Sequence, residues 1–116
     1  MFSRALFWFL MGFTVFYAMT NRKHGRLQLG VTTNPWQQIA HQQYEGSPTL
    51  VYYEVVRDIE MGIDRKDAWK LMGANKRRAL ISVVNPEWED LCPALYCEIG
   101  RSGKLGGFNF EEQEWW

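Results

Sequence analysis

One stretch near the start constrains the fold more than any other feature of this sequence. Sixteen consecutive residues, 5–20, carry no formal charge. Counted from Phe2, the apolar run has nineteen residues, which as a helix is about 28 Å long, close to the hydrocarbon thickness of a bilayer. We therefore predict a membrane-spanning anchor over residues 1–21, with Arg4 reaching back to the interface.

Two alternatives compete with a retained anchor. A secretory signal peptide has a basic start, an apolar middle and small residues at the cleavage site, and Ala18-Met19-Thr20 matches that site poorly. A buried helix of a water-soluble core is the other alternative. Bulky rings favour the anchor, because aromatic residues suit the boundary between lipid and water. The aromatic residues assigned to the anchor are Phe2, Phe7, Trp8, Phe9, Phe13, Phe16 and Tyr17.

Three cations follow the apolar run within five positions, namely Arg22, Lys23 and Arg26. We predict that they lie at the lipid head groups, within a basic linker that spans residues 22–33. They outnumber the positive charges before the run, so the positive-inside rule places the remaining chain on the cytoplasmic or matrix side.

Residues 34–99 are predicted to form a small helical domain. Asn34-Pro35, Ser47-Pro48 and Asn85-Pro86 each combine an N-cap residue with a proline suited to the first helical turn. They predict helices over 35–44 and 48–61 and a short helical turn over 86–91, and Asp64 is the predicted cap of a third helix over 65–80. The run "TLVYYEVV" within 48–61 is also compatible with a strand. The predicted fold class is mainly α, with one membrane helix and about three capped helices.

Residues 100–116 have a different composition, in which four glycines fall within eight positions. Glycine makes regular structure entropically costly, so we predict an extended tail. Its aromatic residues are predicted to dock on a partner protein, as buried aromatic anchors do. They are Phe108, Phe110, Trp115 and Trp116.

Known catalytic and metal-binding patterns are absent from the sequence. His24 and His41 have no neighbouring cysteine or acidic cluster, whereas a metal site needs three or four converging ligands. Cys92 and Cys97 do not follow a zinc or redox spacing, and a disulfide and two free thiols both remain open. We predict no catalytic residue, no metal and no cofactor. Cations on the predicted helix over 65–80 could contact nucleic-acid phosphates, but a net charge of zero and the predicted anchor disfavour nucleic acid as a partner. No small-molecule substrate is predicted.

The chain combines an anchor, a helical side domain and an aromatic tail. In this outline it resembles the supernumerary single-pass subunits of mitochondrial energy-converting complexes. The resemblance implies a non-catalytic accessory subunit of a respiratory complex or the ATP synthase. It also implies the mitochondrial inner membrane, a C-terminal part on the matrix side, and other subunits and lipids as partners. Two alternatives remain. One is a free-standing anchored adaptor that binds a soluble partner or anionic lipid, and the other is a secreted helical domain with a cleaved signal.

Overall fold

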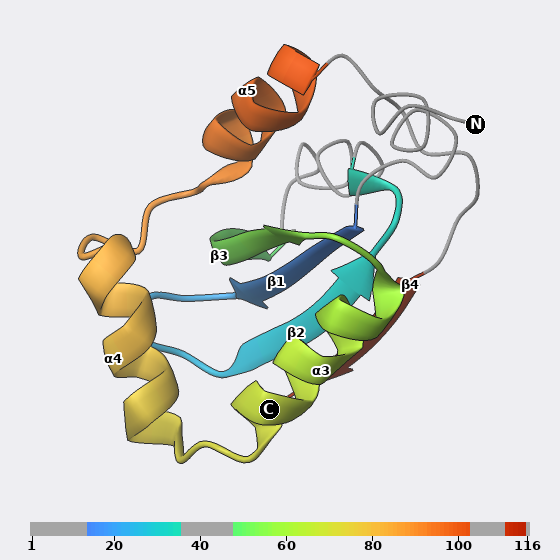
Figure 1. Ribbon diagram of the computed structural model, residues 1–116. Helices are drawn as coiled ribbons and strands as arrows, with labels where there is room; N and C mark the ends of the chain where they lie inside the picture. The colour runs from blue at the N-terminus through green and yellow to red at the C-terminus, as the bar shows by residue number, and fades with distance from the viewer. Residues whose placement is uncertain (1–13, 36–47, 103–110, 116) are drawn as a thin grey trace, which may run out of the picture.

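The protein is a small α/β domain built on one antiparallel sheet, as the computed structural model shows (Figure 1). The structure describes residues 14–35, 48–102 and 111–115. The strands are β1 (Thr14–Thr20), β2 (Leu27–Thr32), β3 (Thr49–Val56) and β4 (Glu111–Trp115), and they lie in the order β3-β1-β2-β4. The helices are α3 (Ile59–Lys70), α4 (Ala74–Val84) and α5 (Cys92–Ser102). A mainly α fold class is therefore wrong.

The apolar run that predicts a membrane anchor contains strand β1, in the interior of the sheet. All seven residues of β1 are buried, including Phe16 and Tyr17. Within the described residues, no helix has the length and apolar character needed to cross a bilayer. The other anchor residues, Phe2, Phe7, Trp8, Phe9 and Phe13, lie outside the described part of the chain.

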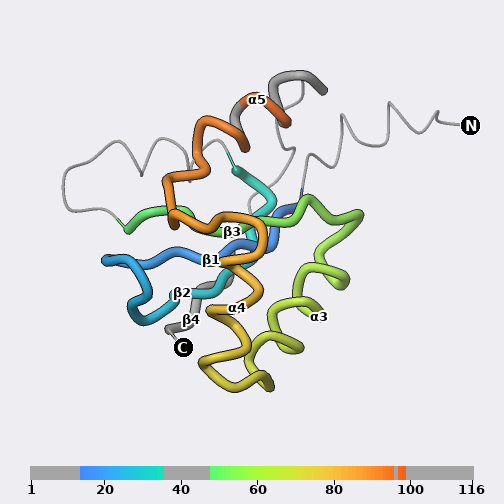
Figure 2. Tube along the Cα trace, turned by 90° about the vertical axis from the view of Figure 1, so that its left-hand side faces the viewer, coloured from blue at the N-terminus to red at the C-terminus, as the bar shows by residue number. Residues whose placement is uncertain are grey.

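Strand β1 lacks charge because packed side chains cover both of its faces. Phe16 and Ala18 belong to the larger core cluster, which includes residues of α3 and α4. Val15, Tyr17 and Met19 alternate onto the opposite face, where they join a smaller cluster with Cys92 and Leu95 of α5. Successive residues of a strand point to opposite faces, so a strand covered on both sides is continuously apolar. Figure 2 shows α3 beside α4, with α5 across the strands from them.

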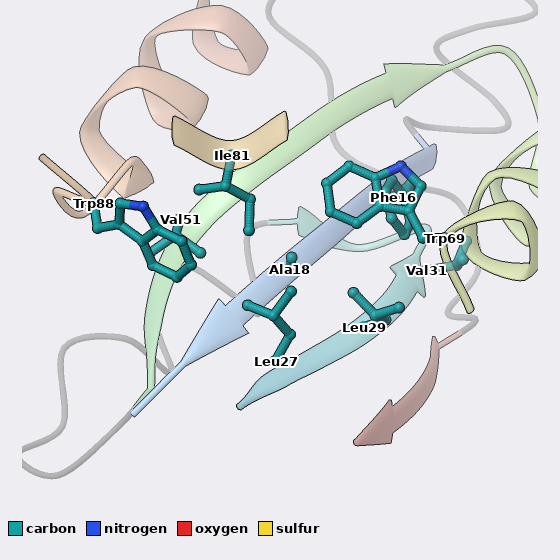
Figure 3. Close-up of a cluster of buried hydrophobic side chains, with 9 residues drawn as sticks. All are labelled: Phe16, Ala18, Leu27, Leu29, Val31, Val51, Trp69, Ile81 and Trp88. Atoms are coloured by element: carbon teal, nitrogen blue, oxygen red, sulfur yellow. The ribbon is translucent and has the colours of Figure 1, made fainter. Parts of the chain in front are cut away.

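The larger cluster is centred on Trp69 of α3, whose side chain is fully buried. The Trp69 ring lies 5.3 Å from the Phe16 ring and 4.6 Å from the Tyr52 ring, between centroids. Such aromatic pairs contribute about 0.5–1.5 kcal/mol each beyond the area they bury. Figure 3 shows Trp69, Ile81 and Trp88 over the sheet, together with side chains from β1, β2 and β3. These contacts hold α3 and α4 on the sheet.

The predicted helix over 48–61 is wrong, because its residues 49–56 form strand β3. Valine, tyrosine and threonine dominate this segment, and they favour the pleated surface of a sheet. The helix that follows begins later, at Ile59, where the Asp58 side chain accepts a hydrogen bond of 2.8 Å from the Met61 amide. Asp64, the predicted cap, lies inside that helix.

The predicted helix over 65–80 is two helices, α3 and α4, separated at Leu71–Gly73. Asn85 is also not an N-cap: it ends α4, and its buried side chain bonds to other segments. No helical turn covers residues 86–91. Of the predicted helix over 35–44, all residues after Pro35 lie outside the described part of the chain.

Two segments with other predicted roles also contribute strands. The predicted basic linker, 22–33, contains β2, and the predicted tail contains β4, which pairs with β2 in antiparallel register. Trp115 is the last residue of β4 and lies opposite Gln28. Phe108, Phe110 and Trp116 lie outside the described residues. Whether the tail docks on a partner stays a prediction.

A hydrogen-bonded cluster fastens α3 to β3. Arg65 of α3 donates to Glu54 of β3 through Nε at 3.0 Å and Nη2 at 2.8 Å, and the Tyr52 hydroxyl donates to Glu54 at 2.6 Å. Burial opposes the charge on Glu54, but the hydrogen bonds from Arg65 and Tyr52 outweigh it, so the pKa of Glu54 lies below its ordinary value. Burial and the bond to Glu54 raise the pKa of Tyr52 to about 12.

Candidate basic groove

Cations from two distant parts of the sequence meet at one end of the sheet. The loop 21–26 joins β1 to β2 and lies next to α4 (Figure 1). A cavity of about 310 Å³ opens between the loop and the first turns of α4. The described residues that line it are Arg22, His24, Gly25, Arg26, Leu27, Ala74, Arg77 and Arg78. None of these carries a carboxylate.

A second cavity, of about 340 Å³, continues along the same loop. Its described lining residues are Thr20, Asn21, Arg22 and Arg26. Arg22 and Arg26 therefore line both cavities. We call the two cavities together the basic groove. A surface with this charge and length suits an anionic ligand that extends over more than one charged group.

Local hydrogen bonds fix the shape of the loop. The Thr20 hydroxyl lies 2.8 Å from the Arg22 carbonyl oxygen and 2.9 Å from that of Arg26. The Gly25 amide donates to the Arg22 carbonyl oxygen at 2.9 Å. A Cβ at Gly25 would lie 2.9 Å from that oxygen and 2.7 Å from the Arg22 Cγ, so the turn requires glycine there. These hydrogen bonds hold the backbone of Arg22 and Arg26 in place.

Arg77 has a structural role at the inner wall of the groove. Its side chain is buried, and its Nη1 donates to the carbonyl oxygens of Trp69 and Met72 at the end of α3. A cation is favourable there because the last carbonyls of a helix carry partial negative charge. Arg78 follows it on α4, and within the described residues neither forms an ion pair with a carboxylate. Their positive charge therefore adds to that of the groove.

The N-terminus of α4 adds a further favourable feature. Its N-cap is Gly73, which has no side chain to bond the first amides, and the first turn contains no acidic residue. The amide groups of a first helical turn carry partial positive charge and bind anions such as phosphate. Ala74, the first residue of α4, lines the groove. This helix end therefore strengthens the attraction exerted by the arginines.

The loop is also held against the segment that follows α4. The His24 ring packs against the Trp88 ring with centroids 4.6 Å apart and the two planes inclined at 53°. Lys23 forms an ion pair with Glu87 at 3.7 Å, although both side chains are largely exposed. Trp88 is buried, and its indole Nε1 donates to the Ser82 hydroxyl at 3.0 Å. These contacts keep the groove wall in place.

Sequence reasoning identified the cations but not their convergence. Arg22, Lys23 and Arg26 are predicted lipid contacts, a role that nothing in the structure tests; Arg22 and Arg26 line the groove, and Lys23 pairs with Glu87. His24, interpreted as an ordinary surface or cap residue, lines the same groove. The alternation in "LQLGVT" is typical of a strand after a tight turn, and it could have indicated that these cations lie in a turn between two strands.

Other chemistry is sparse within the described residues. They contain no group of three or more histidine, cysteine or acidic side chains that could hold a metal ion. Both cysteines of α5 are free thiols: Cys92 is buried and Cys97 is exposed. Burial, with the nearby charge of Asp90, raises the pKa of Cys92 to about 12, which makes it a poor nucleophile.

Comparison of the chain with protein-family models, with curated proteins and with solved structures gave no match. The functional inference therefore depends on the geometry of the groove alone.

Proposed function

We propose that this protein is a non-catalytic binding module that holds the phosphate backbone of a nucleic acid in the basic groove. One observation carries the proposal. Arg22 and Arg26 are shared by two adjoining cavities, Arg77 and Arg78 approach from α4, and no described lining residue is acidic.

Phosphate matches this donor set well. Guanidinium groups present pairs of N–H donors that fit two oxygens of a phosphate. The uncapped first turn of α4 offers backbone amides of the kind that bind phosphate in many proteins. A polymer of phosphates also uses both cavities, because successive charges can contact the shared arginines and then Arg78.

The proposal keeps the predicted non-catalytic role and changes the partner. Two arguments disfavour nucleic acid at the level of sequence, namely zero net charge and a membrane anchor. The anchor is no longer part of the argument, because β1 occupies its C-terminal third. Zero net charge limits long-range attraction, so we expect modest affinity that depends strongly on salt. A mitochondrial accessory-subunit role stays a prediction.

The test is a fluorescence-anisotropy titration of the full chain with labelled 20-mers of DNA and RNA, single- and double-stranded. We expect binding at 50 mM salt and a log–log salt slope of about −2 to −4, because about three or four phosphates are neutralised. Arg22→Gln/Arg26→Gln is expected to weaken binding at least tenfold at 50 mM salt and to reduce the slope by about two.

The single variant Arg26→Gln is expected to weaken binding and to reduce the slope by about one, and Arg57→Gln is its matched control. Arg57 is exposed and follows β3 at the end of the sheet opposite the groove, since Val56 pairs with Thr14 whereas Thr49 pairs with Thr20. Arg57→Gln removes the same charge as Arg26→Gln but at a position far from the groove, so we expect little loss of affinity. Equal losses in Arg26→Gln and Arg57→Gln would show that the groove is not the site. Absence of binding to every oligonucleotide, or equal binding of polyglutamate or anionic vesicles, would refute the proposal.

A further inference from the structure

We infer that His24 contacts the bound phosphate and takes up a proton when the ligand binds. This inference rests on the proposed function and concerns its regulation by pH. His24 is exposed and lines the same cavity as the four arginines of the groove. Imidazole is the ordinary side chain whose charge changes between pH 5 and 8. Of the described lining residues, it is the one whose charge can depend on pH in this range.

The backbone and the neighbouring Trp88 ring hold the His24 ring at the groove. His24 has φ of +58° and Trp88 has φ of +53°, and these are the two non-glycine residues with positive φ in the described chain. Such backbone conformations are uncommon outside glycine and persist where surrounding contacts impose them. The Trp88 ring, whose indole Nε1 donates to Ser82, supplies that contact by packing against the His24 ring. The ring therefore needs little rearrangement to meet a ligand.

The charged groups around His24 determine the sign of the effect. Arg22 and Arg26 face the cavity from its own loop, and Arg77 and Arg78 face it from α4. On the third side, beside Trp88, Glu87 is paired with Lys23. A bound phosphate brings negative charge among these cations and stabilises the imidazolium form of His24. Binding and protonation then favour each other, so affinity rises as the pH falls.

The experiment measures Kd for the tightest-binding oligonucleotide from pH 8.0 to pH 5.5 at constant ionic strength. For the wild type we expect affinity to increase about tenfold over this range, because a hydrogen bond to a charged group contributes about 1.5 kcal/mol or more. His24→Asn cannot become charged, and asparagine tolerates positive φ well. We expect its ratio of Kd between pH 8.0 and pH 5.5 to fall to about one.

His24→Lys supplies a permanent charge at the same position. We expect its Kd ratio also to be near one, with tighter binding than His24→Asn at pH 8.0. Calorimetry in two buffers that differ in ionisation enthalpy measures proton uptake directly. We expect a net uptake in the wild type near pH 6.5 and none in His24→Asn.

His41→Asn is the control, because the chain has two histidines. It should retain the wild-type pH dependence. Oligonucleotide binding that does not vary with pH, or whose variation survives in His24→Asn or disappears in His41→Asn, would overturn this inference and leave the proposed function intact. Absence of oligonucleotide binding at every pH would overturn both.

Discussion

Replacement of Asn85 by alanine is predicted to destabilise the domain more than its position after a helix suggests. Asn85 is 5% exposed, and its side chain makes three hydrogen bonds. Its Nδ2 donates to the carbonyl oxygens of Val51 at 3.1 Å and Glu89 at 2.9 Å, and its Oδ1 accepts from the Glu89 amide at 3.1 Å. Asn85 thus joins β3 to the segment after α4.

The hydrogen bond from Asn85 satisfies the carbonyl oxygen of Val51, a residue that the sheet leaves unpaired. The β1–β3 register shifts between Ala18 and Met19, so Tyr52 and Leu50 have partners in β1 and Val51 has none. A bulged residue of this kind needs another hydrogen-bond partner when it is buried. At about 1 kcal/mol for each lost bond, and with buried groups left unsatisfied, Asn85→Ala should cost about 3 kcal/mol.

Urea denaturation followed by tryptophan fluorescence measures this cost. With a slope of about 2 kcal/mol/M, the midpoint should fall by about 1.5 M. Asn75→Ala is the control, because Asn75 is exposed in the first turn of α4, and it should change the free energy of unfolding by no more than about 0.5 kcal/mol. Equal midpoints for Asn85→Ala and Asn75→Ala would refute the role assigned to Asn85.

Three further predictions concern packing, thiol reactivity and pH. Gly62→Ala should destabilise the fold by about 1–3 kcal/mol, because its Cβ would lie 2.7 Å from Val31 Cγ1, whereas Gly73→Ala, with open space around it, should be nearly neutral in the same urea assay. Iodoacetamide should modify Cys97 but not Cys92 in the native protein, and both in urea, as mass spectrometry would show; rapid native labelling of both would contradict the assigned burial. Because the pKa of Glu54 is lower in the folded than in the unfolded state, its charge stabilises the fold above the unfolded-state pKa of about 4.3. This stability is lost as the pH falls through the folded-state pKa. A Glu54→Gln variant with an unchanged acid-denaturation profile would contradict this.

The sequence was most misleading where one segment had two physical explanations. An uncharged run suits lipid, but it equally suits a strand with helices on both faces, as Phe16 and Tyr17 show by pointing into different core clusters. Length separates the two explanations weakly, because apolar residues continue before the strand begins at Thr14. The β-branched and aromatic residues of 49–56 did indicate a strand as an alternative, and that alternative was correct.

Local capping rules misplaced several helix ends because tertiary contacts determine them. Asn85-Pro86 satisfies the rule for a helix start, yet the Asn85 side chain donates from Nδ2 to Val51 of β3, a strand far away in sequence. Gly62 satisfies the rule for a helix end, yet it lies within α3, where its small size allows close approach to Val31. Such contacts depend on how elements pack and have no local signature.

The candidate site was predictable in its components only. The sequence shows the cations of 22–26 and those of 76–78, in the predicted helix over 65–80, as two separate basic segments. The two basic segments come together in one groove because of the β1–β2 turn and the break between α3 and α4 at Gly73. This break lets α4 start beside the loop. The position of His24 in the groove further depends on its ring contact with Trp88. The meeting of the two basic segments and the position of His24 both follow from the folded arrangement and not from the spacing of residues in the sequence.

The most direct measurement is a two-dimensional ¹H–¹⁵N NMR titration of the full chain with a short oligonucleotide at low salt. If the groove holds the phosphate backbone, the amide signals of residues 21–26 and 74–78 should shift together and saturate with one Kd. Amide signals of residues 57–61, which begin at the opposite end of the sheet, should stay in place. Shifts confined to other surfaces, or no shifts at saturating oligonucleotide, would contradict the account.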